Sequence, residues 1–208
     1  MHRWFTLAAL FLGLASTAAA RSPSPIPTRF LRGVPDVRQM NSSSCGAAAV
    51  QAVVCAFFGD AEGEADYWEL LGSSMKEGTH PKAIVKGLRK LELGAQMREG
   101  MTLAELRHHL DAGRLVILDF QAWGEPAGKD YSKEWEDGHY GVAVGYNDDV
   151  VFIEDPSMHG SVGYLSNGEL EKRWHDYETE DGRRREYHHL AIVVKGKRRP
   201  APQFRRIE

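Results

Sequence analysis

The first half of the chain carries apolar residues at the spacing of amphipathic helices, interrupted by glycines and polar segments. Pro81 fits the first turn of one of these helices, and Thr102 with Glu105 forms a capping box at the start of another. Four helices are therefore expected, each followed by a glycine. The first two cover residues 47–58, before Gly59, and 65–71, before Gly72. The third is capped by Thr79 and ends before Gly94, and the fourth is capped by Thr102 and ends before Gly113.

The second half of the chain turns to patterns typical of strands. Strands are expected at residues 115–120, 140–146, 150–154, 162–165 and 189–194. A long link, 122–138, separates the first two, and a capping box of Ser166 and Glu169 begins a helix that runs through Trp174. Because helices precede an antiparallel meander, the sequence predicts an α+β domain with N-terminal helices packed on an antiparallel β-sheet.

Both ends of the chain differ from this pattern. Residues 1–20 have the basic start, the short apolar stretch and the Ala18-Ala19-Ala20 end of an export signal, and the stretch is too short to span a bilayer comfortably. We expect a periplasmic or secreted mature chain without an integral membrane segment. We expect residues 21–32 to form an extended proline-containing leader and residues 33–195 to fold as a single domain. Residues 196–208 are expected to form a basic tail.

The two cysteines, Cys45 and Cys55, are expected not to pair. If both belong to one helix, ten residues place them about 15 Å apart along its axis, whereas a disulfide requires Cα atoms within roughly 7 Å. Cys55 stands among apolar neighbours and is predicted to be a buried small hydrophobe. Cys45 would then be a free thiol in an exported protein, where disulfides are favoured, and this indicates a chemical function for the thiol.

Cys45 stands where the polar run from Gln39 to Ser44 meets the first predicted helix. The first turn of a helix has unpaired N–H groups, and together with the helix dipole they stabilise negative charge. A thiolate at this position forms more easily and is a better nucleophile at neutral pH. We therefore expect Cys45 to be the nucleophile of a thiol hydrolase.

The hairpin that follows the long link supplies a candidate base and a carboxylate. If Asn147, Asp148 and Asp149 form its loop, Asp155 faces Gly141, and His139 lies two residues further on the same face. That diagonal is roughly 7–8 Å, within reach of a His–Asp hydrogen bond. A two-residue loop would place Asp155 on the opposite face, so the hypothesis predicts an odd loop.

The face of the histidine strand carries mainly small residues, Gly141, Ala143 and Gly145. A closely packed helix could rest on it, and the small residues 47–49 of the nucleophile helix would suit such a contact. We expect this packing to bring Cys45 to His139. His139 would then be the general base, Asp155 would fix its ring, and the Cys45 N–H would stabilise the oxyanion, with the Gln39 amide as a possible second donor.

The ordered set of motifs resembles the C39 peptidases, which are papain-like cysteine peptidases. The matching segments are Gln39-x5-Cys45-Gly46-Ala47-Ala48, Asp137-Gly138-His139-Tyr140-x-Val142-x-Val144-Gly145-Tyr146 and Asp155-Pro156. The resemblance implies Cys45 as nucleophile, His139 as base, Asp155 as orienting carboxylate and Gln39 as oxyanion donor. Well-known members trim leaders after a double glycine and are commonly fused to an ABC exporter. The export signal departs from that pattern, so the fold and the thiol chemistry carry over better than the cleavage specificity.

Several alternatives accompany this hypothesis. A Cys-His-Asp site can also transfer its acyl group to an amine, as transglutaminases do, and a C39-like fold can serve as a non-catalytic binding or secretion module. Trp123 and Trp135, in the long link, are candidates for a substrate groove, whereas core packing is favoured for Trp174. A metal site at His159 and His175 lacks tight ligand spacing.

The partners expected from the sequence are limited. The net charge of −3 gives no indication of nucleic acid or of an acidic membrane. We expect a peptide or protein substrate, no nucleic acid, no cofactor and no metal. The oligomeric state, the natural substrate and the bond that is cleaved are not indicated by the sequence.

Overall fold

The computed structural model describes residues 25–59, 61–124 and 129–197. The predicted export signal (1–20), the first residues of the leader (21–24) and residues 198–208 of the basic tail lie outside the described residues. Where the chain is described, none of its helices is both long and apolar enough to cross a membrane.

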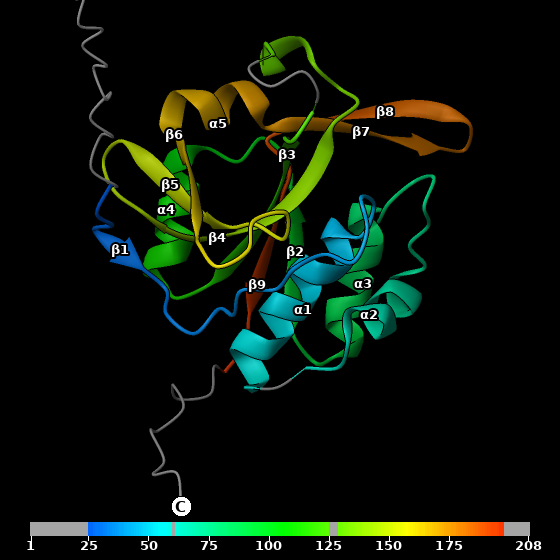
Figure 1. The fold of residues 1–208 in the computed structure, drawn as a ribbon, viewed down its shortest axis with the longest axis horizontal. Helices are drawn as coiled ribbons and strands as arrows, with labels where there is room; N and C mark the ends of the chain where they lie inside the picture. The colour runs from blue at the N-terminus through cyan, green and yellow to red at the C-terminus, as the bar shows by residue number, and fades with distance from the viewer. Residues whose placement is uncertain (1–24, 60, 125–128, 198–208) are drawn as a thin grey trace, which may run out of the picture.

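A seven-stranded antiparallel sheet forms the centre of the molecule (Figure 1). Its strands lie in the order β2-β9-β3-β4-β5-β6, and the short β1 pairs with β4. Strands β3 to β6 follow one another as the expected meander, whereas β9 returns from the end of the chain to lie between β2 and β3. The strands are β1 (Arg29–Phe30), β2 (Gly94–Arg98), β3 (Leu115–Gln121), β4 (Gly138–Tyr146), β5 (Val150–Glu154), β6 (Gly163–Ser166) and β9 (Ala191–Lys195).

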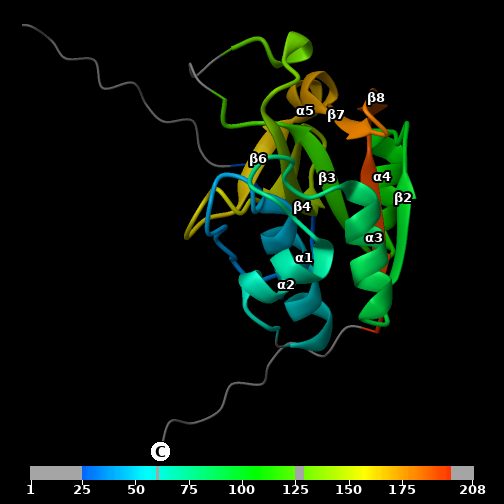
Figure 2. The same cartoon turned by 90° about the vertical axis from the view of Figure 1, so that its right-hand side faces the viewer.

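The helices lie in two groups. Helices α1, α2 and α3 contact one another, with α1 against β4 and α3 against β2, whereas α4 contacts β3 and β4, and α5 lies near β6 (Figures 1 and 2). This arrangement of helices on an antiparallel sheet confirms the predicted α+β class. The helices are α1 (Cys45–Phe58), α2 (Glu64–Leu71), α3 (Pro81–Lys90), α4 (Leu103–Asp111) and α5 (Asn167–Arg173), with a 3-10 turn η1 (Tyr131–Lys133) in the long link.

The core lies between α1 and the central strands. All seven residues of β3 are buried, and α1 is buried along most of its length because its small side chains leave little surface exposed. Ala47, Ala48, Val50 and Val53 have no solvent exposure at all. At roughly 25 cal/mol per Å² of apolar surface removed from water, such burial is the main favourable contribution to folding.

The ends of the helices agree with most of the expected signals. Both capping boxes are present, Thr102 with Glu105 and Ser166 with Glu169. The cap of α3 differs, because the His80 side chain, and not that of Thr79, accepts the Lys82 N–H. The glycine expected to end this helix region, Gly94, instead begins edge strand β2, which the sequence did not predict.

The loop of the β4–β5 hairpin is shorter than expected. The Asn147 N–H donates to the Val150 carbonyl oxygen over 3.0 Å, so only residues 148–149 form the turn. The Asn147 side-chain oxygen accepts the N–H groups of residues 149 and 150, each over 2.9 Å, and thereby closes the turn. The prediction of a three-residue loop was therefore wrong.

A β-bulge in the same hairpin restores the alignment that the site requires. Tyr146 pairs with Val151 near the turn, whereas Ala143 pairs with Ile153 beyond an irregularity between Ala143 and Gly145. The extra residue shifts the register by one position. The far end of the hairpin thus has the alignment that an odd loop would have given.

The small residues of β4 make room for neighbouring strands, and not for α1 as expected. The nearest atoms to a Cβ at Gly141 would be Ile153 Cγ2 at 2.6 Å and Phe120 Cε1 at 3.3 Å. A Cβ at Gly145 would lie 2.5 Å from the Arg29 carbonyl oxygen. Helix α1 does contact β4, but the glycines accommodate side chains of β3 and β5 and the backbone of β1.

A separate two-stranded sheet was not expected from the sequence: β7 (His175–Glu180) and β8 (Arg183–His188). Most of its side chains are polar, and opposite charges face each other across the pair, as Glu178 does Arg185. Asp181 and Gly182 both have positive φ, 50° and 73°, as a two-residue hairpin turn requires. The Asp-Gly dipeptide was the signal that could have predicted it.

The end of the predicted leader belongs to the domain. Strand β1 pairs with the end of β4, Arg29 opposite Tyr146 and Phe30 opposite Gly145. Leu31 is buried at 6% exposure and forms part of the core. The folded domain therefore begins a few residues before the expected boundary at residue 33.

Candidate active site

The polar segment before α1 is held by hydrogen bonds among its own residues. Asn41 Oδ1 accepts the Ser43 N–H over 2.9 Å, and Ser44 Oγ accepts the Asn41 N–H over 3.0 Å. The Ser44 side chain makes no capping bond to α1, and the first turn of α1 has no acidic residue. Cys45 begins this helix, so its sulfur lies where unneutralised helix N–H groups favour negative charge.

A buried carboxylate, which the sequence reasoning missed, supports this segment from α2. Glu64 Oε2 accepts the Met40 N–H over 2.8 Å, and Glu64 is only 5% exposed. Glu64 lies in the first turn of α2, where the helix dipole stabilises its charge. A carboxylate in a first helical turn is common, so nothing in the sequence singled it out.

His139 is buried on β4 and contacts both other members of the expected triad. Its Nε2 lies 2.7 Å from Asp155 Oδ1, and the Cys45 side chain is near enough to the ring to raise its pKa. The edge of the Phe120 ring, from the facing position on β3, packs against it at a centroid distance of 5.6 Å. The bulged hairpin and the start of α1 thus bring Cys45, His139 and Asp155 together.

The surroundings of His139 favour its protonated form. Burial by itself would lower the pKa of His139, but its interactions with Asp155 and Cys45 outweigh it and raise that pKa from 6.5 to about 10. An imidazolium at neutral pH is the partner that a thiolate requires. The geometry and the charge of this group therefore suit a thiolate–imidazolium pair.

Asp155 is fixed by three donors. Besides His139, the Ser157 N–H donates to Oδ1 over 2.8 Å and the Trp123 indole N–H donates to Oδ2 over 3.0 Å. Burial alone would raise the pKa of Asp155, but the bonds to His139, Ser157 and Trp123 lower it below its ordinary value. Asp155 therefore stays a carboxylate and orients the His139 ring.

Trp123 has a role beyond the substrate groove that the sequence suggested. Its φ of 64° lies in the left-handed region, which is strained for a residue of this size. Its side chain is exposed and lines an apolar pocket of about 490 Å³ together with Phe120, Ile153, Met158, Tyr164 and Leu165. The strained backbone thus turns the indole N–H onto Asp155, while the groove role stays a prediction.

Replacing Trp123 by phenylalanine is expected to lower kcat/KM by about tenfold to a hundredfold, because a hydrogen bond to a charged group contributes roughly 1.5–3 kcal/mol. Trp123 holds Asp155 in line with the His139 ring, so without it the His139–Asp155 hydrogen bond should weaken, the pKa of His139 should fall and the basic limb of the pH–rate profile should shift downward. The matched control is Trp68→Phe on α2, for which neither change is expected. An unshifted basic limb would assign Trp123 to packing alone.

Gln39 connects the cysteine segment to the residues after Asp155. Its Nε2 donates to the Asn41 carbonyl oxygen over 2.7 Å, and its Oε1 accepts the Ser157 hydroxyl over 3.0 Å. Its backbone N–H donates to the Pro156 carbonyl oxygen over 3.0 Å. Gln39 therefore lies close to both halves of the site, and its function as an oxyanion donor stays a prediction.

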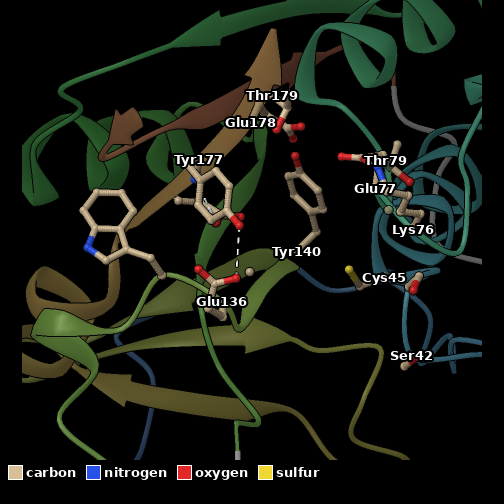
Figure 3. Close-up of a pocket in the computed structure, with 15 residues that line it drawn as sticks. Ser42, Cys45, Lys76, Glu77, Thr79, Glu136, Tyr140, Tyr177, Glu178 and Thr179 are labelled. Carbon is tan, nitrogen blue, oxygen red and sulfur yellow. Dashed lines mark hydrogen bonds and ion pairs between the residues drawn. The ribbon is translucent and has the colours of Figure 1, made fainter. Parts of the chain in front are cut away.

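A polar pocket of about 270 Å³ opens beside Cys45 (Figure 3). One wall is the segment from Ser42 to Cys45 with residues 76–79, and the facing wall comes from the long link and from β7. Trp135, one of the two groove candidates, lines this pocket and packs on the His175 ring at a centroid distance of 4.5 Å.

The close approach of the two segments that form the first wall depends on a glycine. A Cβ at Gly46 would lie 2.6 Å from Thr79 Cβ, a distance that side chains do not tolerate. Gly46→Ala should therefore cost about 1–3 kcal/mol of unfolding free energy, the usual effect of overpacking, measured by urea denaturation. The control is Gly168→Ala on α5, where nothing lies within 4 Å, and equal stabilities of the two variants would contradict the prediction.

The remaining candidates of the sequence analysis have other environments. Trp174 is fully buried, and its indole N–H donates to the Leu190 carbonyl oxygen over 2.8 Å, as core packing predicts. His175 Nε2 lies 2.6 Å from the Glu134 carbonyl oxygen, and His159 Nδ1 lies 3.5 Å from Asp36. In the parts of the chain that are described, no three His, Cys, Asp or Glu side chains are grouped as metal ligands.

The two cysteines both lie in α1, and no disulfide joins them. This agrees with the helical spacing argument. Cys55 is half-buried and not fully buried as predicted.

Comparison with solved structures supports the same fold. A putative C39-like peptidase from Bacillus anthracis matches with a TM-score of 0.60 and 16% identity, over 82% of this chain and 98% of that one. The peptidase domain of Streptococcus ComA, a bi-functional ABC transporter involved in quorum sensing, matches with a TM-score of 0.55 and 21% identity, over 76% and 95%.

A third solved structure is a double glycine motif protease from an AMS/PCAT transporter, in complex with its leader peptide. It matches with a TM-score of 0.52 and 16% identity, over 81% of this chain and 95% of that one. No curated protein sequence matches significantly. The family model of the Peptidase_C39 like family matches residues 31–181, which is well over half of the chain and includes every member of the candidate site. The chain therefore belongs to the Peptidase_C39 like family.

Proposed function

We propose that this protein is an exported thiol peptidase with Cys45 as nucleophile, His139 as base and Asp155 as orienting carboxylate. The observation that carries the proposal is the buried His139 ring, whose Nε2 lies 2.7 Å from Asp155 and whose pKa the neighbouring Cys45 side chain helps to raise. A histidine held between a carboxylate and a thiol at a helix start is the arrangement that thiol hydrolysis requires.

His139 transfers protons in both half-reactions of the proposed mechanism. His139 takes the Cys45 thiol proton, and the thiolate attacks the carbonyl carbon of the scissile peptide bond. The C–N bond then breaks as the imidazolium donates its proton to the leaving amine, which leaves a thioester on Cys45. A water molecule that loses a proton to His139 hydrolyses the thioester and releases the acid and the thiol.

The oxyanion formed in each half-reaction needs hydrogen-bond donors. We assign the Cys45 backbone N–H as one donor, because it lies at the start of α1 next to the reacting sulfur. The Gln39 amide is the second, since its loop contacts both the cysteine segment and Pro156. Each such donor contributes roughly 10²–10³ in kcat.

The substrate of this proposal is a peptide or a protein segment. The double glycine motif protease binds a leader peptide, and the present chain has two pockets, one beside Cys45 and one beside Trp123, on either side of the His139–Asp155 pair. Export, from the signal at residues 1–20, is part of the proposal. Specificity for cleavage after a double glycine is not part of the proposal.

The experiment compares new peptide termini in the exported fraction of cells that carry the wild-type protein or the Cys45→Ala variant. Cys55→Ala is the matched control, because Cys55 lies on the same helix ten residues further on. Termini should appear with wild type and Cys55→Ala alone, and a thiol-directed electrophile should label Cys45. Isopeptide products would identify acyl transfer instead, and an unlabelled Cys45 with no new termini would favour a binding module.

A further inference from the structure

The pocket beside Cys45 is lined by more acidic groups than its cations balance. Glu77, Glu136, Asp176 and Glu178 all line it, and Lys76 is its single basic residue among those described. Lys76 pairs with Glu77 and its side chain is 88% exposed, so it does not neutralise the interior. The pocket therefore holds more carboxyl groups than cations to pair with them.

Two buried polar side chains lie next to these carboxyl groups. Asp119 on β3 and Tyr140 on β4 face each other in the sheet and are 2% and 6% exposed. Among the described residues the Tyr140 hydroxyl has no hydrogen-bond partner. Asp119 meets the Asp176 carboxyl, and burial together with that proximity raises the pKa of Asp119. Tyr140 lines the pocket, and its hydroxyl points toward Glu178 (Figure 3). Buried polar groups are nearly always satisfied, so the Tyr140 hydroxyl needs an explanation.

The carboxylates raise one another's pKa. Burial, together with the neighbouring Asp176 charge, raises the pKa of Glu178 to about 8 and that of Asp119 well above its usual range. Burial also raises the pKa of Asp176. Such a group of acids is unfavourable when empty and ionised, and a cation placed among them would remove the repulsion.

The backbone brings this acidic group next to the reacting atoms. A Cβ at Gly138 would lie 2.1 Å from Asp176 Oδ2, so only glycine lets the carboxylate approach the residue that precedes His139. Asp176 Oδ1 is held there by the Gln121 side-chain amide over 3.0 Å. Because Cys45 lines the same pocket, a ligand in it lies beside the scissile bond.

We propose that this pocket is a specificity subsite that takes the cationic side chain of a lysine or arginine next to the scissile bond. Asp176 and Glu178 bind the cation, and the Tyr140 hydroxyl gains the partner that it lacks. The inference rests on the proposed peptidase function and names the substrate class of the same site. Charge-assisted hydrogen bonds are about twice as strong as neutral ones, so the side-chain charge dominates the selection.

The test uses acetylated and amidated peptides, which have no terminal charge, with lysine or its uncharged analogue norleucine placed at each position near the cleaved bond. At one of these positions kcat/KM should be about tenfold to a hundredfold higher for lysine. Glu178→Gln and Asp176→Asn should move this ratio toward one. Glu180→Gln, on the same strand but outside the pocket and paired with Lys82, should keep it.

The preference should also depend on pH. The pKa of Glu178 is about 8, so its carboxyl group is largely protonated below that pH. For the wild-type protein, the ratio of kcat/KM for the lysine peptide to kcat/KM for the norleucine peptide should therefore increase as the pH is raised through 8. In Glu178→Gln the ratio should not respond to pH in this range. A ratio that is the same at pH 6 and pH 9 in the wild-type protein would argue against Glu178 as a cation ligand.

A binding measurement separates this inference from the proposed function. Cys45→Ala protein, which cannot form the thioester, should bind the lysine peptide more tightly than the norleucine peptide. If that preference holds while the wild-type protein cleaves no peptide, the subsite stands and the peptidase function fails. If the wild-type protein cleaves both peptides equally well, the peptidase function stands and the subsite is overturned, whatever the variants do.

Discussion

Replacing His139 by alanine is expected to lower kcat by at least roughly 10³-fold, as removal of one member of a nucleophile–base unit does in other hydrolases. Without the ring, the Cys45 thiol has no proton acceptor and the leaving amine has no donor. KM should change much less, because His139 is buried and not part of either pocket lining. Steady-state kinetics on any peptide that the wild-type protein cleaves measures both.

The variant should still fold. Asp155 keeps the N–H donors of Ser157 and Trp123, so its carboxylate is not left without partners when the ring is removed. Circular dichroism and urea denaturation check this point. The matched control is His159→Ala, because His159 is exposed near the same hairpin and pairs with Asp36 instead. Equal loss in both variants, or none in either, would remove His139 from the chemistry.

The sequence predicted the site through the chemistry of its residue types. Cys45 stood at the junction of a polar loop with an apolar helix, and Asp155 stood at the distance along a hairpin where it could meet His139. The distance between His139 and Asp155, 2.7 Å, agrees with that hypothesis. The alignment of the two strands does not arise from a three-residue loop as predicted, because a β-bulge near Val144 compensates for a two-residue turn. A bulge depends on tertiary packing and leaves no periodic signal in the sequence.

Other features escaped prediction for physical reasons that can be named. The residues of strands β7 and β8 are nearly all polar, so apolar periodicity does not reveal the strands. The hydrogen bond from Trp123 to Asp155 joins residues 32 positions apart and needs a positive φ at a non-glycine residue. Both features contribute to the site, because β7 carries Asp176 and Glu178 of the pocket beside Cys45 and Trp123 donates a hydrogen bond to the Asp155 carboxylate.

The environment on the two sides of the His139–Asp155 pair is different in kind. The pocket beside Trp123 is lined mainly by apolar side chains such as Phe120 and Met158. The pocket beside Cys45 is polar and acidic. A peptide that crosses the site as proposed would meet an apolar surface on one side and an acidic one on the other, and we therefore expect a preference for amphipathic substrates with a basic residue near the cleaved bond.

Replacing Asp155 by alanine is the second change with a large expected effect. The carboxylate fixes the ring of His139 and stabilises its charge, and its loss should lower kcat by roughly 10²–10⁴-fold. Asp155→Asn keeps a carbonyl oxygen for the His139 N–H and should retain more activity than alanine. Asp149→Ala, in the exposed turn of the same hairpin, is the control and should leave kcat unchanged. A kcat in Asp155→Ala equal to that of the Asp149→Ala control would contradict an orienting role.

The same pair determines how stability depends on pH. The folded pKa of His139 is about 10 against an ordinary 6.5, so its contribution to the unfolding free energy is complete below about pH 6.5 and is lost as the pH rises through 10. The folded pKa of Asp155 lies below its ordinary 3.8, so its contribution is present above that pH and is lost as the pH falls further. Urea midpoints of the wild-type protein should therefore decline between pH 6.5 and 10 more steeply than those of Asp155→Ala, in which the pKa of His139 falls. Parallel curves over that interval would show that the two side chains do not share a charge-stabilised hydrogen bond.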